Sequence, residues 1–305
     1  MKFYVGVTDN SWFKYLAERN PDEVNFWRPS GKSFGAINTG YPFLFKLHSP
    51  LNFIAGGGFF VKSFKLPLSL AWDAFGKNNG SDNISQLRSL INNRRSESSF
   101  NPEIGCIILN QPFFLPRDKW IPVPENWSMN IVAGKTYDTS EIFGKRLWEQ
   151  VQSRLQEMSI PEQESLIAEE GGRYGKDYLR KARLGQGAFR VLLTEAYQRS
   201  CAVTGERTLP VLQAAHIKPF SESGPNQISN GLLLRSDLHI LFDNGYITIT
   251  PDYHIEVSKR IKEEFDNGRE YYPFHGQKLT ILPEHKDEQP GEKFINWHNE
   301  NVFVS

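Results

Sequence analysis

The chain has 305 residues and a formal net charge of zero, because 35 lysines and arginines balance 35 aspartates and glutamates. This length exceeds the usual size of one domain, so we expect two, and any surface that binds nucleic acid must be a local one. Two cysteines, Cys106 and Cys201, exclude a disulfide framework and a four-cysteine zinc site, and no run of about 18 apolar residues suggests a membrane span; we therefore expect a cytoplasmic protein.

Residues 1–138 contain short aromatic and β-branched segments between clusters of Gly, Pro, Asn and Ser. The segments are KFYVGV, YPFLFKL, GGFFVKSFKL and EIGCIILNQPFFL. This pattern is typical of strands and predicts a compact β-rich barrel domain. Two helices interrupt it, one over residues 11–19 with Ser11 as N-cap and one over residues 81–95 with Ser81 or Asp82 as N-cap.

The next segment, residues 139–170, has a helical pattern. Its apolar side chains recur at intervals of three and four residues: Phe143, Leu147, Val151, Leu155 and Met158. We expect a helical linker here, followed by a second domain over residues 171–305.

The charge changes sign along this part of the chain. Residues 141–170 carry seven acids and three bases, whereas residues 171–199 carry seven bases and two acids. A local excess of cations is what contact with DNA phosphates requires, although a solvated helix face has the same pattern. The candidate phosphate contacts are Arg173, Lys176, Arg180, Lys181, Arg183 and Arg190, together with Arg235 further along the chain.

Residue types that are typical of catalytic sites are concentrated in residues 213–245, QAAHIKPFSESGPNQISNGLLLRSDLHILFDNG. If RSDLHILFDNG is a helix, His239 and Asp243 lie one turn apart on one face and can share a divalent metal ion. Water and a phosphate oxygen would complete the coordination, as in a catalytic site. His216, on a preceding strand, could accept a proton from the attacking water, with Asn230 orienting its ring.

This strand, loop and helix would form a small ββα unit around the metal. Each histidine also has a structural interpretation, because His216 could be a satisfied core residue and His239 could form a surface pair with Asp243.

The stretch from RLGQGAFRVLLTEAY to LLLRSDLHILFDNGYITI, about residues 180–250, resembles the HNH nuclease superfamily through its AHI, NGL, LH and LFD motifs. The resemblance implies a ββα-metal fold that hydrolyses phosphodiesters with one divalent ion. It implies that His216 is the general base, Asn230 the central asparagine, and His239 and Asp243 the metal ligands. Mg²⁺ or Mn²⁺ is expected, and Co²⁺ or Ni²⁺ would also suit an imidazole and a carboxylate.

The sequence departs from the family pattern at two places. Ala215 stands where many members have a metal-binding Asp or His, which leaves the full ligand set open. CAVTG stands where many relatives have the first of two paired CxxC motifs, so Cys201 is expected to be a small buried residue.

Residues 1–138 resemble the EVE branch of the PUA-like fold, chiefly through YPFLFKL followed by the glycine-rich IAGGGFF. The resemblance implies a β-barrel with a pocket for a flipped, modified base. Aromatic faces stack on an extruded base and glycines let it approach the backbone, although each aromatic could equally be a core residue. The candidate pocket residues are Asn25, Trp27, Gly57, Phe59 and Trp72.

The two halves together resemble the modification-dependent restriction endonucleases of bacteria. We therefore expect an α+β protein, and its substrate to be double-stranded DNA with 5-methyl- or 5-hydroxymethylcytosine, cut by a homodimer because one HNH site cuts one strand. Two alternatives remain open, a protein that binds modified nucleic acid without cutting it and an HNH nickase of another specificity.

Overall fold

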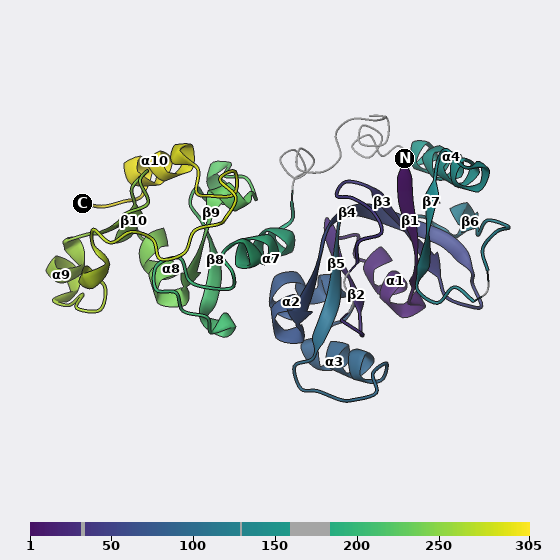
Figure 1. The fold of residues 1–305 in the computed structure, drawn as a ribbon, viewed down its shortest axis with the longest axis horizontal. Helices are drawn as coiled ribbons and strands as arrows, with labels where there is room; N and C mark the ends of the chain where they lie inside the picture. The colour runs from purple at the N-terminus through teal and green to yellow at the C-terminus, as the bar shows by residue number, and fades with distance from the viewer. Residues whose placement is uncertain (32–33, 129, 159–183) are drawn as a thin grey trace. The chain divides into compact units, whose positions relative to one another are not determined.

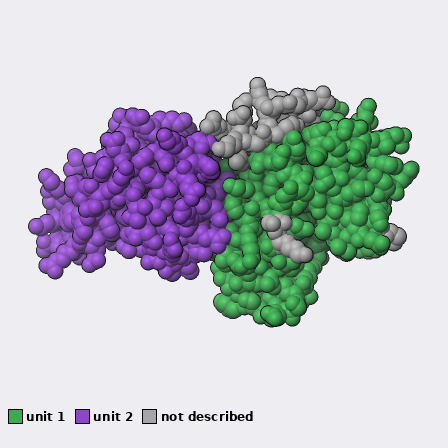
Figure 2. All heavy atoms as spheres, in the orientation of Figure 1, with its two compact units in different colours: residues 1–185 green, residues 186–305 purple. Residues whose placement is uncertain are grey.

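The computed structural model describes residues 1–31, 34–128, 130–158 and 184–305. The chain divides into two compact units, Met1–Gly185 and Gln186–Ser305, which Figure 2 shows in different colours. No helix in these ranges is both long and apolar enough to cross a membrane.

Unit 1 is built on a seven-stranded sheet with the order β2-β5-β4-β3-β1-β7, in which β6 also pairs with β4 (Figure 1). The strands are β1 (Lys2–Thr8), β2 (Glu23–Arg28), β3 (Pro42–Leu47), β4 (Phe53–Pro67), β5 (Glu103–Phe114), β6 (Ile121–Pro122) and β7 (Gly134–Asp138). Strands β1 and β3 are parallel, and the other neighbours are antiparallel. Within the described residues β2 and β7 each have one partner strand, so the expectation of a closed barrel was wrong.

A short turn packs against β2 and is bonded to two of its side chains. Asn25 Nδ2 donates to Asn79 Oδ1 at 2.8 Å, and Trp27 Nε1 donates to the Asn79 carbonyl at 2.9 Å. Asn79 ends the 3-10 helix Gly76–Asn79 that follows α2 (Leu68–Phe75). Asn25 and Trp27 are two residues apart on β2, so both side chains lie on one face of the strand and join it to this turn.

Alternation along the strands gives the sheet two apolar faces. On β1, Tyr4 packs in one core cluster, whereas Phe3 and Val5 pack in the other. The first cluster is covered by α1 (Asn10–Ala17) and the second by α4 (Ile142–Glu157). The helix expected in the linker is therefore present, and its apolar side packs on the core of unit 1. The rest of the expected linker, residues 159–170, lies outside the described residues.

The helix starts differ by one or two residues from the predicted N-caps. Asp9 caps α1, because its Oδ1 accepts hydrogen bonds from the backbone N–H groups of Ser11 and Trp12 at 2.9 Å. Asn83 caps α3 (Ile84–Asn92) and accepts from the backbone N–H of Gln86. Asp and Asn are caps as good as serine, so composition alone did not distinguish the neighbouring candidates.

Unit 2 has one core, to which its helices and hairpins all contribute. Its elements are α7 (Gln186–Ala196), β8 (Leu212–His216), β9 (Gly231–Arg235), α8 (Ser236–Asp243), β10 (Ile247–Ile249), β11 (Ile255–Val257), α9 (Arg260–Phe265) and α10 (Glu292–Asn301). Strands β8 and β9 form an antiparallel pair with His216 opposite Gly231, and α8 follows β9 directly. The predicted ββα unit is confirmed.

Candidate functional site

A cleft of about 450 Å³ in unit 2 brings together three of the predicted nuclease residues. Its lining residues are Ala214, His216, Ile217, Pro219, Phe220, His239, Asp243, His298 and Val302. His216 comes from the end of β8, whereas His239 and Asp243 come from consecutive turns of α8. Residues that are far apart in sequence thus share one solvent-filled space.

His239 and Asp243 have the arrangement expected of ligands to one cation. His239 Nδ1 lies 2.7 Å from the Gln213 side-chain oxygen, and since an amide oxygen only accepts, Nδ1 carries the proton. Nε2, the other ring nitrogen, lies 3.2 Å from Asp243 Oδ2 and would present a lone pair to a cation in the neutral ring. Two acceptor atoms this close repel each other unless a proton or a cation lies with them.

The surroundings of Asp243 favour a positive partner. Burial raises the pKa of its carboxyl group, while the rings of His239 and His216 lower it. Within the described ranges no third His, Cys, Asp or Glu joins this pair. The donor set thus fits a divalent ion with two protein ligands and open positions for water and phosphate.

The surroundings of His216 favour the neutral imidazole. Its Nε2 lies 2.8 Å from Asn226 Oδ1, and its ring stacks on Phe189 at a centroid distance of 4.2 Å. Burial lowers its pKa from 6.5, against the smaller raising effects of Asn226 and Asp243. Because the amide oxygen accepts, Nε2 carries the proton and Nδ1 keeps the lone pair that a general base needs.

Asn230 acts on the loop between β8 and β9. It is fully buried, its Oδ1 accepts from the Lys218 backbone N–H, and its Nδ2 donates to the carbonyls of Lys218 and Pro225, all at 2.9 Å. These bonds fix the loop that carries Asn226. Asn230 thus orients the His216 ring indirectly, by fixing the loop from which Asn226 contacts that ring. The sequence predicted that Asn230 itself would orient the ring.

Ala215 lies in the hydrophobic core of unit 2 and is fully buried, whereas its neighbours Ala214 and His216 line the cleft. Strand alternation points a side chain at position 215 away from the cleft. Cys201 is also fully buried, as predicted.

Most of the predicted phosphate contacts cannot be placed. Arg173, Lys176, Arg180, Lys181 and Arg183 lie outside the described residues. Arg190 is half-buried on α7. Arg235 forms a bidentate ion pair with Asp237, with N–O distances of 2.7 and 2.8 Å, so its charge is already matched by a carboxylate.

Sequence analysis missed three residues of this site. Gln213 and Asn226 fix the two histidine rings, and Phe220 lines the cleft with 65% of its surface exposed. The amides lie 26 and 10 residues from the histidines they contact, and no local motif marks such pairs. The sequence shows an aromatic residue four positions after the candidate base, but only the structure shows that its side chain is exposed.

His298, also in the cleft lining, makes unit 2 sensitive to acid. Its ring stacks on Phe242, its Nε2 donates to the Phe242 carbonyl at 3.1 Å, and burial lowers its pKa from 6.5 to about 4. The unfolded chain therefore binds a proton between these pH values and the folded chain does not, so stability falls as pH drops through this window. We expect a loss of about 3 kcal/mol between pH 7 and pH 4 from this residue.

Urea unfolding of the wild type and of His298→Gln at both pH values measures this contribution. The variant should be less stable at pH 7 but should lose about 3 kcal/mol less on acidification. Equal losses in the two proteins would show that His298 does not cause the acid sensitivity.

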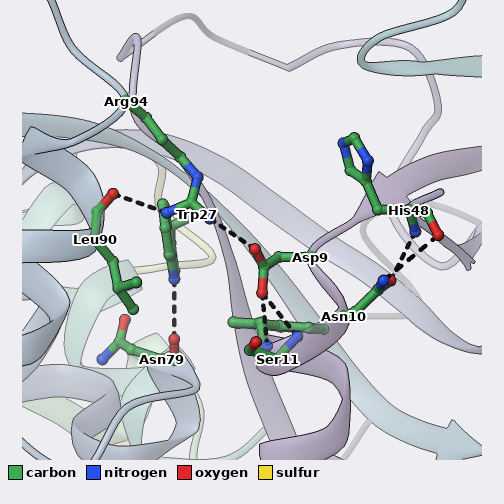
Figure 3. Close-up of polar contacts among 9 residues, drawn as sticks. Asp9, Asn10, Ser11, Trp27, His48, Asn79, Leu90 and Arg94 are labelled. Atoms are coloured by element: carbon green, nitrogen blue, oxygen red, sulfur yellow. Dashed lines mark hydrogen bonds and ion pairs between the residues drawn. The ribbon is translucent and has the colours of Figure 1, made fainter. Parts of the chain in front are cut away.

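Unit 1 contains a separate cavity of about 380 Å³ lined by residues of β1, β2 and α1 and of the segments beside them. Its lining residues are Val7, Asp9, Trp12, Phe26, Trp27, Arg28, Pro29, Ser30, His48, Arg94, Val132 and Ala133. Figure 3 shows Trp27 held at its Nε1 edge by the Asn79 carbonyl, with Arg94 bridging to Asp9. Trp27 thus presents an aromatic surface to this space in a fixed orientation.

The other four predicted pocket residues lie elsewhere in unit 1. Asn25 and Phe59 are buried, and the space over Gly57 is filled by the Phe113 ring and the Phe43 carbonyl. Trp72 is half-buried on α2, outside the cavity lining. The glycines of β4 permit close packing of neighbouring strands, and Asn25 supports Asn79 behind Trp27.

Comparison with solved structures finds distant similarities. Two mutant forms of ZmASCH from Zymomonas mobilis align at 11% and 10% identity with TM-scores of 0.35, each covering 49% of this chain and 98% and 95% of theirs. The modification-dependent TagI restriction endonuclease aligns at 15% identity with a TM-score of 0.28, over 86% of this chain and 61% of its own. No curated protein matches the chain.

A family comparison matches the sequence of the cleft itself. Residues 201–250 match the HNH_2 model, described as HNH endonuclease, and this range includes His216, Asn230, His239 and Asp243. The chain thus contains an HNH endonuclease domain, which supports a nuclease, and hence a hydrolase, activity.

Proposed function

We propose that the chain is a metal-dependent endodeoxyribonuclease that recognises modified cytosine in double-stranded DNA and hydrolyses phosphodiester bonds near it. The proposed nuclease activity is supported by the convergence of His216, His239 and Asp243 on one cleft, within the residues that match the HNH model. The proposed recognition of modified cytosine is supported by the aromatic cavity at Trp27.

In the proposed mechanism, His216 takes the proton from the water that attacks the scissile phosphorus. Its Nδ1 accepts this proton, while the bond from Nε2–H to Asn226 keeps the ring in position and stabilises the charge that develops on it. The neutral ring is ready for this role because burial lowers its pKa. The attack breaks the bond to the leaving oxygen in line with the incoming water.

His239 and Asp243 would hold the divalent ion, Mg²⁺ or Mn²⁺, or else Co²⁺ or Ni²⁺. When bound, such an ion neutralises phosphate charge and acts as a Lewis acid toward the leaving oxygen. Gln213 keeps Nε2 of His239 on the cleft side by accepting a hydrogen bond from Nδ1–H.

The cavity of unit 1 would receive the modified base after it leaves the duplex stack. Trp27 offers a planar face, and its indole orientation is fixed from behind by Asn79 and Asn25. Flipping costs a few kcal/mol whether or not cytosine is modified, so discrimination of 5-methyl- or 5-hydroxymethylcytosine must arise from contacts with the added group.

Because each chain has one HNH site, a double-strand break calls for two sites, which a homodimer would supply.

Removal of the Trp27 indole should weaken recognition of modified DNA. Loss of base stacking costs about 1 to 3 kcal/mol, so we expect Trp27→Leu to bind a duplex with one 5-methylcytosine several-fold to a hundredfold more weakly. Trp72→Leu, outside the cavity, is the matched control and should bind as the wild type does. Fluorescence anisotropy gives both affinities, and equal binding by the two variants would place the base pocket elsewhere.

A cleavage assay tests the whole proposal. Plasmid DNA with cytosine, 5-methylcytosine or 5-hydroxymethylcytosine is incubated with the protein and Mg²⁺ or Mn²⁺, and EDTA serves as the metal-free control. We expect cutting of modified DNA only, and only with metal. Cutting of all three plasmids would support the nuclease activity but contradict recognition of modified cytosine. Binding of modified DNA without cutting would favour the non-enzymatic alternative.

A further inference from the structure

The cavity of unit 1 combines aromatic walls with a basic rim. Trp12, Phe26 and Trp27 supply the aromatic surface, and three basic residues join them: Arg28, His48 and Arg94. Aromatic faces suit a planar base, and guanidinium and imidazole groups suit a phosphate. A cavity with both surfaces fits a ligand that carries a base and a phosphate together.

The basic residues differ in how their charge is used. Arg94 donates to Asp9 Oδ2 at 2.6 Å and to the Leu90 carbonyl at 2.8 Å, and it lies over the Trp27 ring (Figure 3). Its charge is thus balanced by a carboxylate inside the cavity. In this way Arg94 closes one side of the aromatic surface and helps to hold it.

Arg28 and His48, in contrast, have side chains without a hydrogen bond or ion pair to any part of the chain that the structure describes. Arg28 is half-buried at the end of β2, directly after Trp27. Holding a partly desolvated guanidinium without a counter-charge is unfavourable, and an anionic ligand would relieve that cost. His48 is exposed and lines the same cavity, as a second donor for the same anion.

We propose that this cavity binds a whole nucleotide, with the base against Trp27 and the phosphate on Arg28 and His48. The inference rests on the proposed function for the identity of the base as modified cytosine. A flipped base brings its flanking phosphate with it, so Arg28 would neutralise the phosphate at the position where the duplex is opened, with His48 as a second hydrogen-bond donor. Unit 1 would then contribute phosphate contacts of its own, in addition to any from the basic stretch.

Calorimetry on the full chain tests this division of labour. The probes are 5-methyl-2′-deoxycytidine 5′-monophosphate and the corresponding nucleoside. Each is titrated to about 10 mM, so that dissociation constants in the millimolar range can still be measured. We expect the nucleotide to bind at least about tenfold more tightly, as a charge-assisted contact predicts. Arg28→Gln should remove most of this preference without changing nucleoside affinity, and His48→Gln should reduce it.

Arg117→Gln, an exposed arginine outside the cavity, is the matched control and should keep the full preference. On methylated duplex bound by the non-cutting His216→Ala chain, adding Arg28→Gln should lower the salt-dependence slope by roughly 0.9.

Equal affinity for nucleotide and nucleoside in the wild type, or an unchanged preference in Arg28→Gln, would overturn the phosphate assignment while leaving the base pocket in place. Competition by inorganic phosphate as strong as that by the nucleotide would make the cavity a simple anion site and overturn the inference as well. Absence of binding by both probes would remove nucleotide binding from this cavity. None of these outcomes alters the plasmid cleavage result, which judges the nuclease separately.

Discussion

His216→Ala is expected to reduce DNA cleavage by a factor of about 100 to 10,000, the usual contribution of a positioned general base. The cause is the loss of the Nδ1 lone pair that accepts the proton of the attacking water. Affinity for DNA should change little, because the base acts on water and contributes little to ground-state binding. Single-turnover cleavage and anisotropy binding on the same methylated duplex separate the two effects.

His285→Ala is the matched control, since His285 is exposed and lies outside the cleft. It should cut at the wild-type rate. Cleavage by His216→Ala within about tenfold of the wild type would remove His216 from the role of base, because a positioned base contributes more than this.

Asp243→Ala and His239→Ala should raise the metal concentration needed for half-maximal cleavage by at least about tenfold, besides lowering the maximal rate. Each removes one of the two protein donors that lie 3.2 Å apart on α8. Because no group of three or more His, Cys, Asp or Glu among the described residues could hold a metal ion, little remains to hold it once one donor is removed.

Titration of cleavage with Mn²⁺ and with Mg²⁺ gives the half-maximal concentrations, and Asp252→Ala, an exposed aspartate outside the cleft, serves as control. An unchanged metal requirement in both cleft variants, with only the rate reduced, would contradict the assignment of His239 and Asp243 as ligands.

The proximity of His216, His239 and Asp243 was predictable from sequence because their arrangement is largely local. His239 and Asp243 are one helical turn apart, and His216 ends the strand that pairs with the strand before that helix. Periodicity therefore placed His239 and Asp243 on one face, and the hairpin brought His216 to the same side. The same local patterns predicted α1, α3 and α4, with errors at the helix ends.

The tertiary structure decided what depends on contacts between distant segments. The expected barrel is an open sheet, in which β2 and β7 each have one partner strand within the described residues. Asn25 and Trp27 on β2 bind the turn at Asn79, more than fifty residues away in sequence. Contacts between distant segments also decide the surroundings of Gly57, because the pairing of β4 with β3 and β5 fills the space over this residue.

By itself, the sequence determined the ββα unit and its histidines, whose spacing follows from the helical and strand repeats. Only the tertiary structure selected Asn226 and Gln213 as partners of the histidines, and placed Arg28 and His48 beside Trp27 in the lining of one cavity. Many Asn, Gln, Trp and Arg residues were available, and none of them carries a local signal of its partner. The packing of whole strands and loops brings these side chains together, and that packing depends on the sum of many weak apolar contacts across the chain.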